Sequence, residues 1–221
     1  MKIRVLMFGF LFAVFAPWDA FTQQQLSKDE ILNDYRTNRV RLNIDSIFRW
    51  EVHSTTRTLL DNLIEADVDT LVVYLVSFPG QVYIGKRDSC WNGYPTNSYF
   101  FWKKNGKYLY VDTDGLCKSL EKPTSAKVVT FAVDNYTKID SEFFMGAVTS
   151  AVRKGDDIRV KQNMVNHEPK YSILVLVHRQ YNYLTFTENG LTDNSSLFVN
   201  YNKELSSFRL FELVKIQIRN D

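Results

Sequence analysis

Three histidines, His53, His167 and His178, are the side chains best suited to proton transfer near neutral pH. None has another histidine three or four residues away, the spacing at which one helix face presents two metal ligands. His167 stands in the segment Asn-His-Glu-Pro (166–169), whose proline is incompatible with the helix of a zinc-protease motif. We therefore expect structural or solvated histidines, no catalytic residue, no metal site and no cofactor.

Closely spaced carboxylates form the second group with chemical potential, because they can hold calcium or act as an acid–base pair. The pairs are Asp67 with Asp69, Asp112 with Asp114, and Asp156 with Asp157. The segment Asp-Thr-Asp-Gly (112–115) resembles the opening of a calcium loop, but Pro123 occupies the position of the closing glutamate. A turn that ends a strand is the preferred interpretation, since Asp and Gly favour such turns.

Two cysteines, Cys90 and Cys117, complete the reactive side chains. In an exported chain, an even number of cysteines favours a disulfide over free thiols. The bridge would enclose 26 residues, which the chain-entropy model values at about 3–4 kcal/mol. We therefore predict a Cys90–Cys117 disulfide, which would leave neither sulfur free to act as a nucleophile.

Between the cysteines, the segment 100–111 predicts a β-hairpin, because Asn-Gly (105–106) is the strongest two-residue turn signal. Alternation along the two strands separates two faces. The predicted core face carries Phe100, Trp102, Leu109 and Val111, and the opposite face carries Tyr99, Phe101, Tyr108 and Tyr110. The second face could stack on a sugar ring or a peptide. The alternative, which we prefer, is that a helix or a second sheet covers it.

The rest of the chain predicts mixed helices and strands. Helices are expected at 27–40, where Ser27 and Glu30 form a capping box, and at 45–67, 140–154 and 202–219. The last of these also alternates like a strand near its end. Strands are expected at 70–78, 127–133, 171–177 and 182–187. The predicted fold is α+β, with an antiparallel sheet and a disulfide-flanked hairpin packed against N- and C-terminal helices.

The N-terminus predicts a signal peptide over residues 1–22. Lys2 and Arg4 precede an uncharged apolar run of 13 residues, Val5 to Pro17, whereas a membrane span needs about 20. Small residues at Ala20 and Thr22 favour cleavage before Gln23; the alternative is an uncleaved anchor. Residues 23–221 then form one domain with no second long apolar segment. Its net charge of +1 gives no electrostatic reason to expect binding of nucleic acid.

Three features together resemble small exported proteins of Bacteroidota that have no assigned function. These are the apolar leader that runs into glutamines, the segment YFFWKKNGKYLYV (99–111) between the cysteines, and the segment NYNKEL (200–205) before an amphipathic C-terminal end. The resemblance implies export beyond the inner membrane and carries no catalytic residues.

We therefore expect a periplasmic or extracellular protein that is a binding or envelope-associated module rather than an enzyme. Its partner would be a glycan, a peptide or an envelope protein. The alternative is a secreted or periplasmic hydrolase whose reactive residues come together only in the fold.

Overall fold

The computed structural model describes residues 24–38, 54–78, 96–114, 117–155, 157–165 and 167–220. The predicted signal peptide, His53, Asp156 and Cys90 lie outside these ranges. The Cys90–Cys117 disulfide therefore stays a prediction, with Cys117 at the start of the short strand β4. No helix of the described ranges is long and apolar enough to cross a bilayer.

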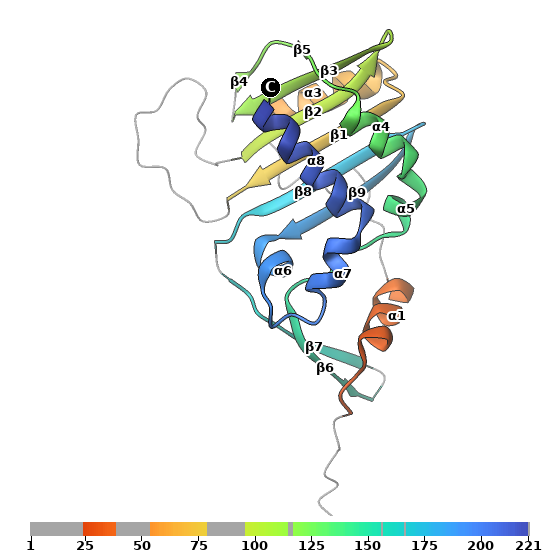
Figure 1. Ribbon diagram of the computed structural model, residues 1–221, viewed down its shortest axis with the longest axis vertical. Coiled ribbons are helices and arrows are strands. Elements are labelled where there is room, and N and C mark those ends of the chain that lie inside the picture. The colour runs from red at the N-terminus through yellow and green to blue at the C-terminus, as the bar shows by residue number, and fades with distance from the viewer. Residues whose placement is uncertain are drawn as a thin grey trace, which may run out of the picture.

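The protein has an α+β fold with an antiparallel sheet, as predicted. In the described ranges the main sheet has seven strands, in the order β4-β3-β2-β1-β8-β9, with β5 also paired to β3 (Figure 1). Its strands are β1 (Thr70–Ser77), β2 (Thr96–Lys104), β3 (Lys107–Asp114), β4 (Cys117–Lys118), β5 (Lys122–Pro123), β8 (Lys170–Val177) and β9 (Gln180–Thr187). Among the described residues, a second sheet pairs β6 (Val148–Lys154) with β7 (Asp157–Gln162).

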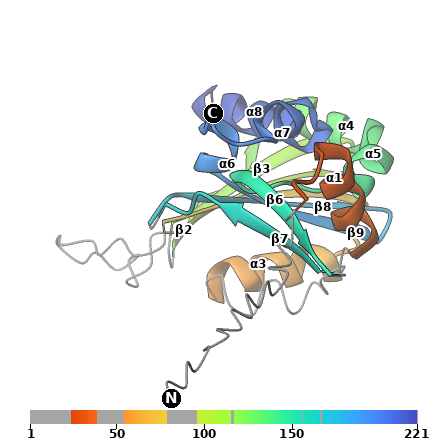
Figure 2. The same cartoon turned by 90° about the horizontal axis from the view of Figure 1, so that it is seen from below.

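Helices lie on both faces of the main sheet (Figure 2). The helices of the described ranges are α1 (Lys28–Asn38), α3 (Ser54–Glu65), α4 (Lys127–Asp134), α5 (Tyr136–Ser141), α6 (Glu188–Thr192), α7 (Val199–Glu204) and α8 (Ser206–Asn220). The helices α4 and α8 pack on one face, and α3 packs on the other. The central strand β1 is therefore buried on both sides: Leu71 and Val73 face α3, whereas Val72 and Tyr74 face α4 and α8. This explains its continuous apolar sequence.

The predicted hairpin and its register are confirmed. Asn105 and Gly106 have positive φ angles of 50° and 75°, as a tight turn requires. Phe100 faces Val111, and Lys104 faces Lys107 at the exposed tip. On the predicted core face, three of the four side chains are buried, while Leu109 is half-buried at the edge of the cluster under α3.

A third cluster of buried side chains lies beside the main sheet, at the end formed by β9 (Figure 1). Here Ile31 of α1 packs with Met145, Val148 and Phe198. The sequence predicted that the N-terminal helix packs against the sheet with the hairpin. Instead, the apolar side of α1 meets β6 and the start of α7, so α1 does not cover the hairpin. The Ser27 and Glu30 capping box at its beginning is confirmed by hydrogen bonds in both directions.

Two predicted elements are wrong. Residues 127–133 form the helix α4, because Val128, Val129 and Ala132 meet the sheet at helical spacing while β5 already occupies the edge of β3. The predicted helix 140–154 is absent beyond its first two residues: Asp140 and Ser141 end α5, 142–146 are irregular, and β6 follows, paired to β7. The β-branched residues of β6 pair with β7 after a turn that contains Gly155 at φ 63°. This strand pairing outweighs the apolar spacing that favoured a helix.

The other predicted helices and strands are confirmed where the structure describes them. The segment 202–219 is helical but breaks at Leu205 between α7 and α8. The carboxylate of Glu142 accepts hydrogen bonds from the backbone N–H groups of Ser206 and Ser207, at 2.6 and 2.8 Å, which fixes the start of α8. In α3 the buried positions include Leu59, whereas Ile64 is 39% exposed.

Candidate functional site

The aromatic side chains predicted to bind a ligand lie together on one face of the hairpin. Phe101 and Tyr110 are 0% and 4% exposed, and their ring centres are 5.0 Å apart. Tyr99 and Tyr108 are half-buried and pack on the same core as α4 and α8. Burial raises the pKa of Tyr99. Helices cover this face, in agreement with the preferred interpretation, and its use as a ligand platform stays a prediction.

A hollow of about 400 Å³ opens between the end of α1 and the strand β7. Its aromatic side is formed by Tyr35, Phe143 and Phe144, with the rings of Tyr35 and Phe143 stacked 6.4 Å apart and 8° from parallel. Its aliphatic side is formed by Ile158 and Val160, alternate residues on one face of β7. Asp34 and Asn38 of α1 supply polar groups at the rim.

A second hollow of about 390 Å³ adjoins the first, because Tyr35 and Phe144 line both. It continues past the end of β7 to the start of β8, where His167, Glu168 and Lys170 lie in its wall. We name the two hollows together the α1–β7 groove. Two adjoining hollows suit an elongated ligand, and an aromatic floor with scattered polar groups is typical of binding sites.

The loop after β7 presents apolar side chains at the rim of the groove. Met164 is 82% exposed and Val165 is 55% exposed, and both line the second hollow. The loop is anchored on each side of them. Asn163 donates hydrogen bonds to Asp193 and Ser195, at 2.8 and 2.9 Å.

On the other side of the exposed pair, the Glu168 carboxylate accepts a hydrogen bond of 2.7 Å from the backbone N–H of Asn189. The side-chain amide of Asn189 also donates to the carbonyl of Asn163, at 2.8 Å. Hydrogen bonds from Ser195 and Asn163 lower the pKa of Asp193, so this carboxylate stays ionised and keeps accepting them. The loop is therefore fixed to α6 and its surroundings, while Met164 and Val165 still point to solvent.

Buried contacts hold the floor of the groove in place. The side-chain amide of Asn202, 0% exposed, accepts a hydrogen bond from the Met145 N–H and donates to the carbonyl oxygens of Met145 and Gly190. The neighbouring Phe144 ring packs edge-on against Phe186 of β9, with centres 5.1 Å apart. One buried amide thereby joins α6, α7 and the segment that carries the aromatic floor.

Burial and the nearby Asp34 raise the pKa of Tyr35, and a hydrogen bond with Gln162 opposes them. The Tyr35 hydroxyl therefore stays protonated at neutral pH and is suited to hydrogen bonding rather than to proton abstraction. The described groups of the groove are mixed in sign, with Asp34 and Glu168 against Lys170. The arrangement can hold a ligand with both apolar and polar parts.

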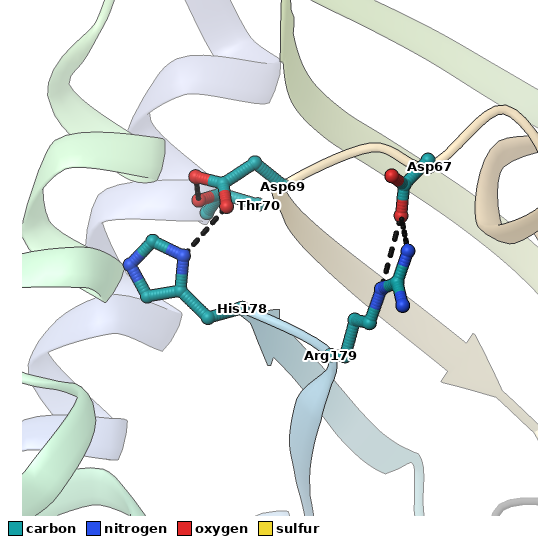
Figure 3. A network of polar contacts seen from close by, with 5 residues as sticks. All are labelled: Asp67, Asp69, Thr70, His178 and Arg179. Carbon is teal, nitrogen blue, oxygen red and sulfur yellow. Dashed lines mark hydrogen bonds and ion pairs between the residues drawn. The ribbon is translucent and has the colours of Figure 1, made fainter.

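A second group of polar side chains lies at the opposite end of β8 and β9, where their turn meets the connection from α3 to β1 (Figure 3). We name Asp67, Asp69, His178 and Arg179 the turn cluster. Nδ1 of His178 lies 2.6 Å from the Asp69 carboxylate, and Arg179 donates two hydrogen bonds, of 2.8 and 3.1 Å, to one oxygen of Asp67. The Asp67 carboxylate raises the pKa of Arg179.

Three residues of the turn cluster have left-handed backbone conformations. The φ angles are 52° at Asp67, 48° at His178 and 66° at Arg179. Consecutive positive φ angles are the signature of tight hairpin turns, which usually carry Asn-Gly because a side chain there costs about 1–2 kcal/mol per residue. The hydrogen bonds of Arg179 with Asp67 and of His178 with Asp69 offset part of this cost and hold the two loops side by side.

The His178–Asp69 pair has the geometry by which a carboxylate orients a catalytic base. Both side chains are exposed, at 72% and 67%, so solvent screens their interaction. Within the described ranges the hydroxyl group nearest in sequence is that of Thr70. It donates a hydrogen bond of 3.4 Å to the Asp69 carboxylate and not to the His178 imidazole. Among these residues, no nucleophile is therefore aligned with the His178 imidazole. The turn cluster gives no support to the alternative that the protein is a hydrolase.

Metal binding has no support in the part of the chain that the structure describes, where no three His, Cys, Asp or Glu side chains gather as ligands. Of the predicted carboxylate pairs, Asp67 and Asp69 bind Arg179 and His178 instead. Asp112 and Asp114 lie in β3, opposite Tyr99 and Asn97 of β2.

Apart from His167 and Glu168, the residues of the α1–β7 groove were not singled out from the sequence. They come from four separate segments that only the fold brings together. The sequence contained one local signal. Met164 and Val165 are adjacent apolar residues in an otherwise polar stretch, and exposed apolar residues that lie together often mark an interaction site.

Comparison of the chain with family models, with curated proteins and with solved structures finds no match in any of the three.

Proposed function

We propose that this protein is an exported binding module whose α1–β7 groove holds an extended peptide segment. The observation that carries the proposal is the anchored loop that presents Met164 and Val165 beside an aromatic floor. Exposed apolar side chains on a fixed backbone cost little entropy on binding, and apolar surface next to a groove is typical of interaction sites. Export is supported by the basic and apolar sequence of residues 1–22.

A peptide is favoured over a glycan because β7 is an outer strand. Among the described residues its backbone pairs only with β6, whose other side meets Gln25. An extended peptide can add to such an edge through main-chain hydrogen bonds. Its alternate side chains would then meet Ile158 and Val160, which have the two-residue spacing of one strand face.

Affinity selection from a random peptide library on the immobilised mature protein tests the proposal. Enriched peptides, labelled with a fluorophore, are titrated by anisotropy against wild type and against the double variant Met164→Ser with Val165→Ser. We expect at least tenfold weaker binding by the double variant, because two apolar contacts of about 1 kcal/mol each are lost.

The matched control is Leu120→Ser, because Leu120 is a similarly exposed apolar residue, at 85%, outside the groove. It should bind the peptides as wild type does. Failure to enrich any peptide, or equal loss in the control, would contradict a peptide groove at this position. Retention of a labelled oligosaccharide that is lost in the double variant would instead assign the groove to glycans.

A further inference from the structure

A cavity of about 480 Å³ opens between the last turn of α3 and the β8–β9 hairpin, next to the turn cluster. Its apolar wall is formed by Ile64, Val68, Leu176 and the ring of Tyr181, with the last two facing each other across β8 and β9. Ile64 is 39% exposed although it is aliphatic. The cavity thus offers apolar contact area that the described fold does not fill.

The charged groups at its mouth are predominantly acidic. Glu65 and Asp67 line the cavity together with Arg179. Arg179 binds one oxygen of Asp67, and the second oxygen has no hydrogen bond within the described ranges. Glu65 likewise has no ion-pair partner there.

The end of α3 adds to this negative potential. Glu65 is the last residue of the helix, and no basic residue lies in the last turn. The carboxyl end of a helix carries partial negative charge, which a cation would normally offset. Two carboxylates, those of Glu65 and Asp67, therefore lie with one guanidinium at the cavity mouth.

We propose that this cavity binds a small organic ammonium ion, a primary amine on a short alkyl or aryl chain. The chain occupies the apolar wall, and the ammonium lies between Glu65 and the unpaired oxygen of Asp67. The Tyr181 ring adds a surface on which a cation is attracted to the aromatic face. The site is independent of the peptide groove, since Lys170 and Thr187 at that groove are the far ends of β8 and β9.

Hexylammonium chloride is the probe, titrated into isotope-labelled mature protein and followed by amide chemical shifts. We expect saturable shifts at Val68, Leu176 and Tyr181. Sodium hexanoate, which has the same chain length and the opposite charge, should give none at equal ionic strength. Absence of saturable shifts with the amine, or equal affinity for hexanoate, would overturn the proposal.

Two variants with opposite expected effects locate the charge contacts. Glu65→Gln should weaken hexylammonium binding about 3–5-fold, the effect of one solvent-facing charge contact. Arg179→Gln should strengthen it by a similar factor, because Asp67 is then no longer neutralised. The control is Asp61→Asn, which removes the same charge one turn earlier on α3, where Asp61 pairs with Arg57 outside the cavity. Equal effects of Glu65→Gln and Asp61→Asn would show only long-range attraction and would overturn the site.

Discussion

The buried amide of Asn202 should contribute an unusually large share of the protein's stability. In Asn202→Ala, the Met145 N–H loses its acceptor and two carbonyl oxygens lose a donor, in a position that water does not reach. Each buried group left without a partner costs about 1–3 kcal/mol. We expect the free energy of unfolding to fall by about 3–5 kcal/mol, a substantial part of the 5–15 kcal/mol typical of a folded protein.

Urea denaturation of the mature protein, followed by tryptophan fluorescence and circular dichroism, measures this loss. The midpoint should fall while the slope of free energy against urea stays constant, because the surface exposed on unfolding is unchanged. Asn200→Ala is the matched control, since Asn200 lies on the same helix and is exposed. It should change the free energy of unfolding by no more than about 0.5 kcal/mol.

A second variant separates the donor role of Asn202 from simple loss of volume. Asn202→Asp keeps the shape but places a carboxylate against the carbonyl oxygens of Met145 and Gly190. Burial among acceptors raises the pKa of such a carboxyl group, so the loss of stability should be large at neutral pH and shrink as the pH falls towards about 4. If Asn202→Ala and Asn200→Ala have equal unfolding free energies, the buried hydrogen bonds do not hold this region together and the reasoning fails.

Three further predictions concern the core, alkaline pH and the N-terminus. Trp102→Ala should lower the free energy of unfolding by about 3–5 kcal/mol, because the 1% exposed ring leaves a large cavity; a change below about 1 kcal/mol in urea denaturation would contradict its place in the core. Burial raises the pKa of Tyr74 above that of an unfolded tyrosine, so the unfolded state ionises first: stability should be full below about pH 10, the unfolded value, and fall above it. Melting curves across this range should show a shallower fall in Tyr74→Phe than in wild type. Mass spectrometry of the exported protein should find Gln23 as the first residue and, after alkylation without reduction, unlabelled Cys90 and Cys117; an intact Met1 or two labelled thiols would each refute its part.

Local sequence determined the elements whose signals are contained in a few neighbouring residues. Asn105-Gly106 supplies the left-handed backbone that a two-residue turn needs, and the turn then sets the whole register of β2 against β3. The Ser27–Glu30 capping box marks the start of α1, because both partners lie within one turn of the helix. In each case the decisive interaction spans only a few residues.

Tertiary structure decided the elements whose apolar pattern fits both a helix and a strand. Residues 127–133 have high strand propensity, yet they form α4 because the sheet edge beside them is occupied and the face above it needs cover. The segment 148–154 forms β6 because its partner strand β7 begins at Asp157, directly after the turn that follows Lys154. Propensities differ by about 1 kcal/mol or less, so burial against distant residues outweighs them.

The candidate sites depend on tertiary structure even more. The α1–β7 groove joins side chains from α1, the segment 142–147, β7 and the following loop, and no spacing in the sequence relates them. The sequence did provide the residue types, among them Asp67 and Asp69 as a pair of carboxylates. Only the meeting of two loops 109 residues apart paired Asp69 with His178, because polar side chains form such contacts wherever backbone packing brings them within hydrogen-bonding distance.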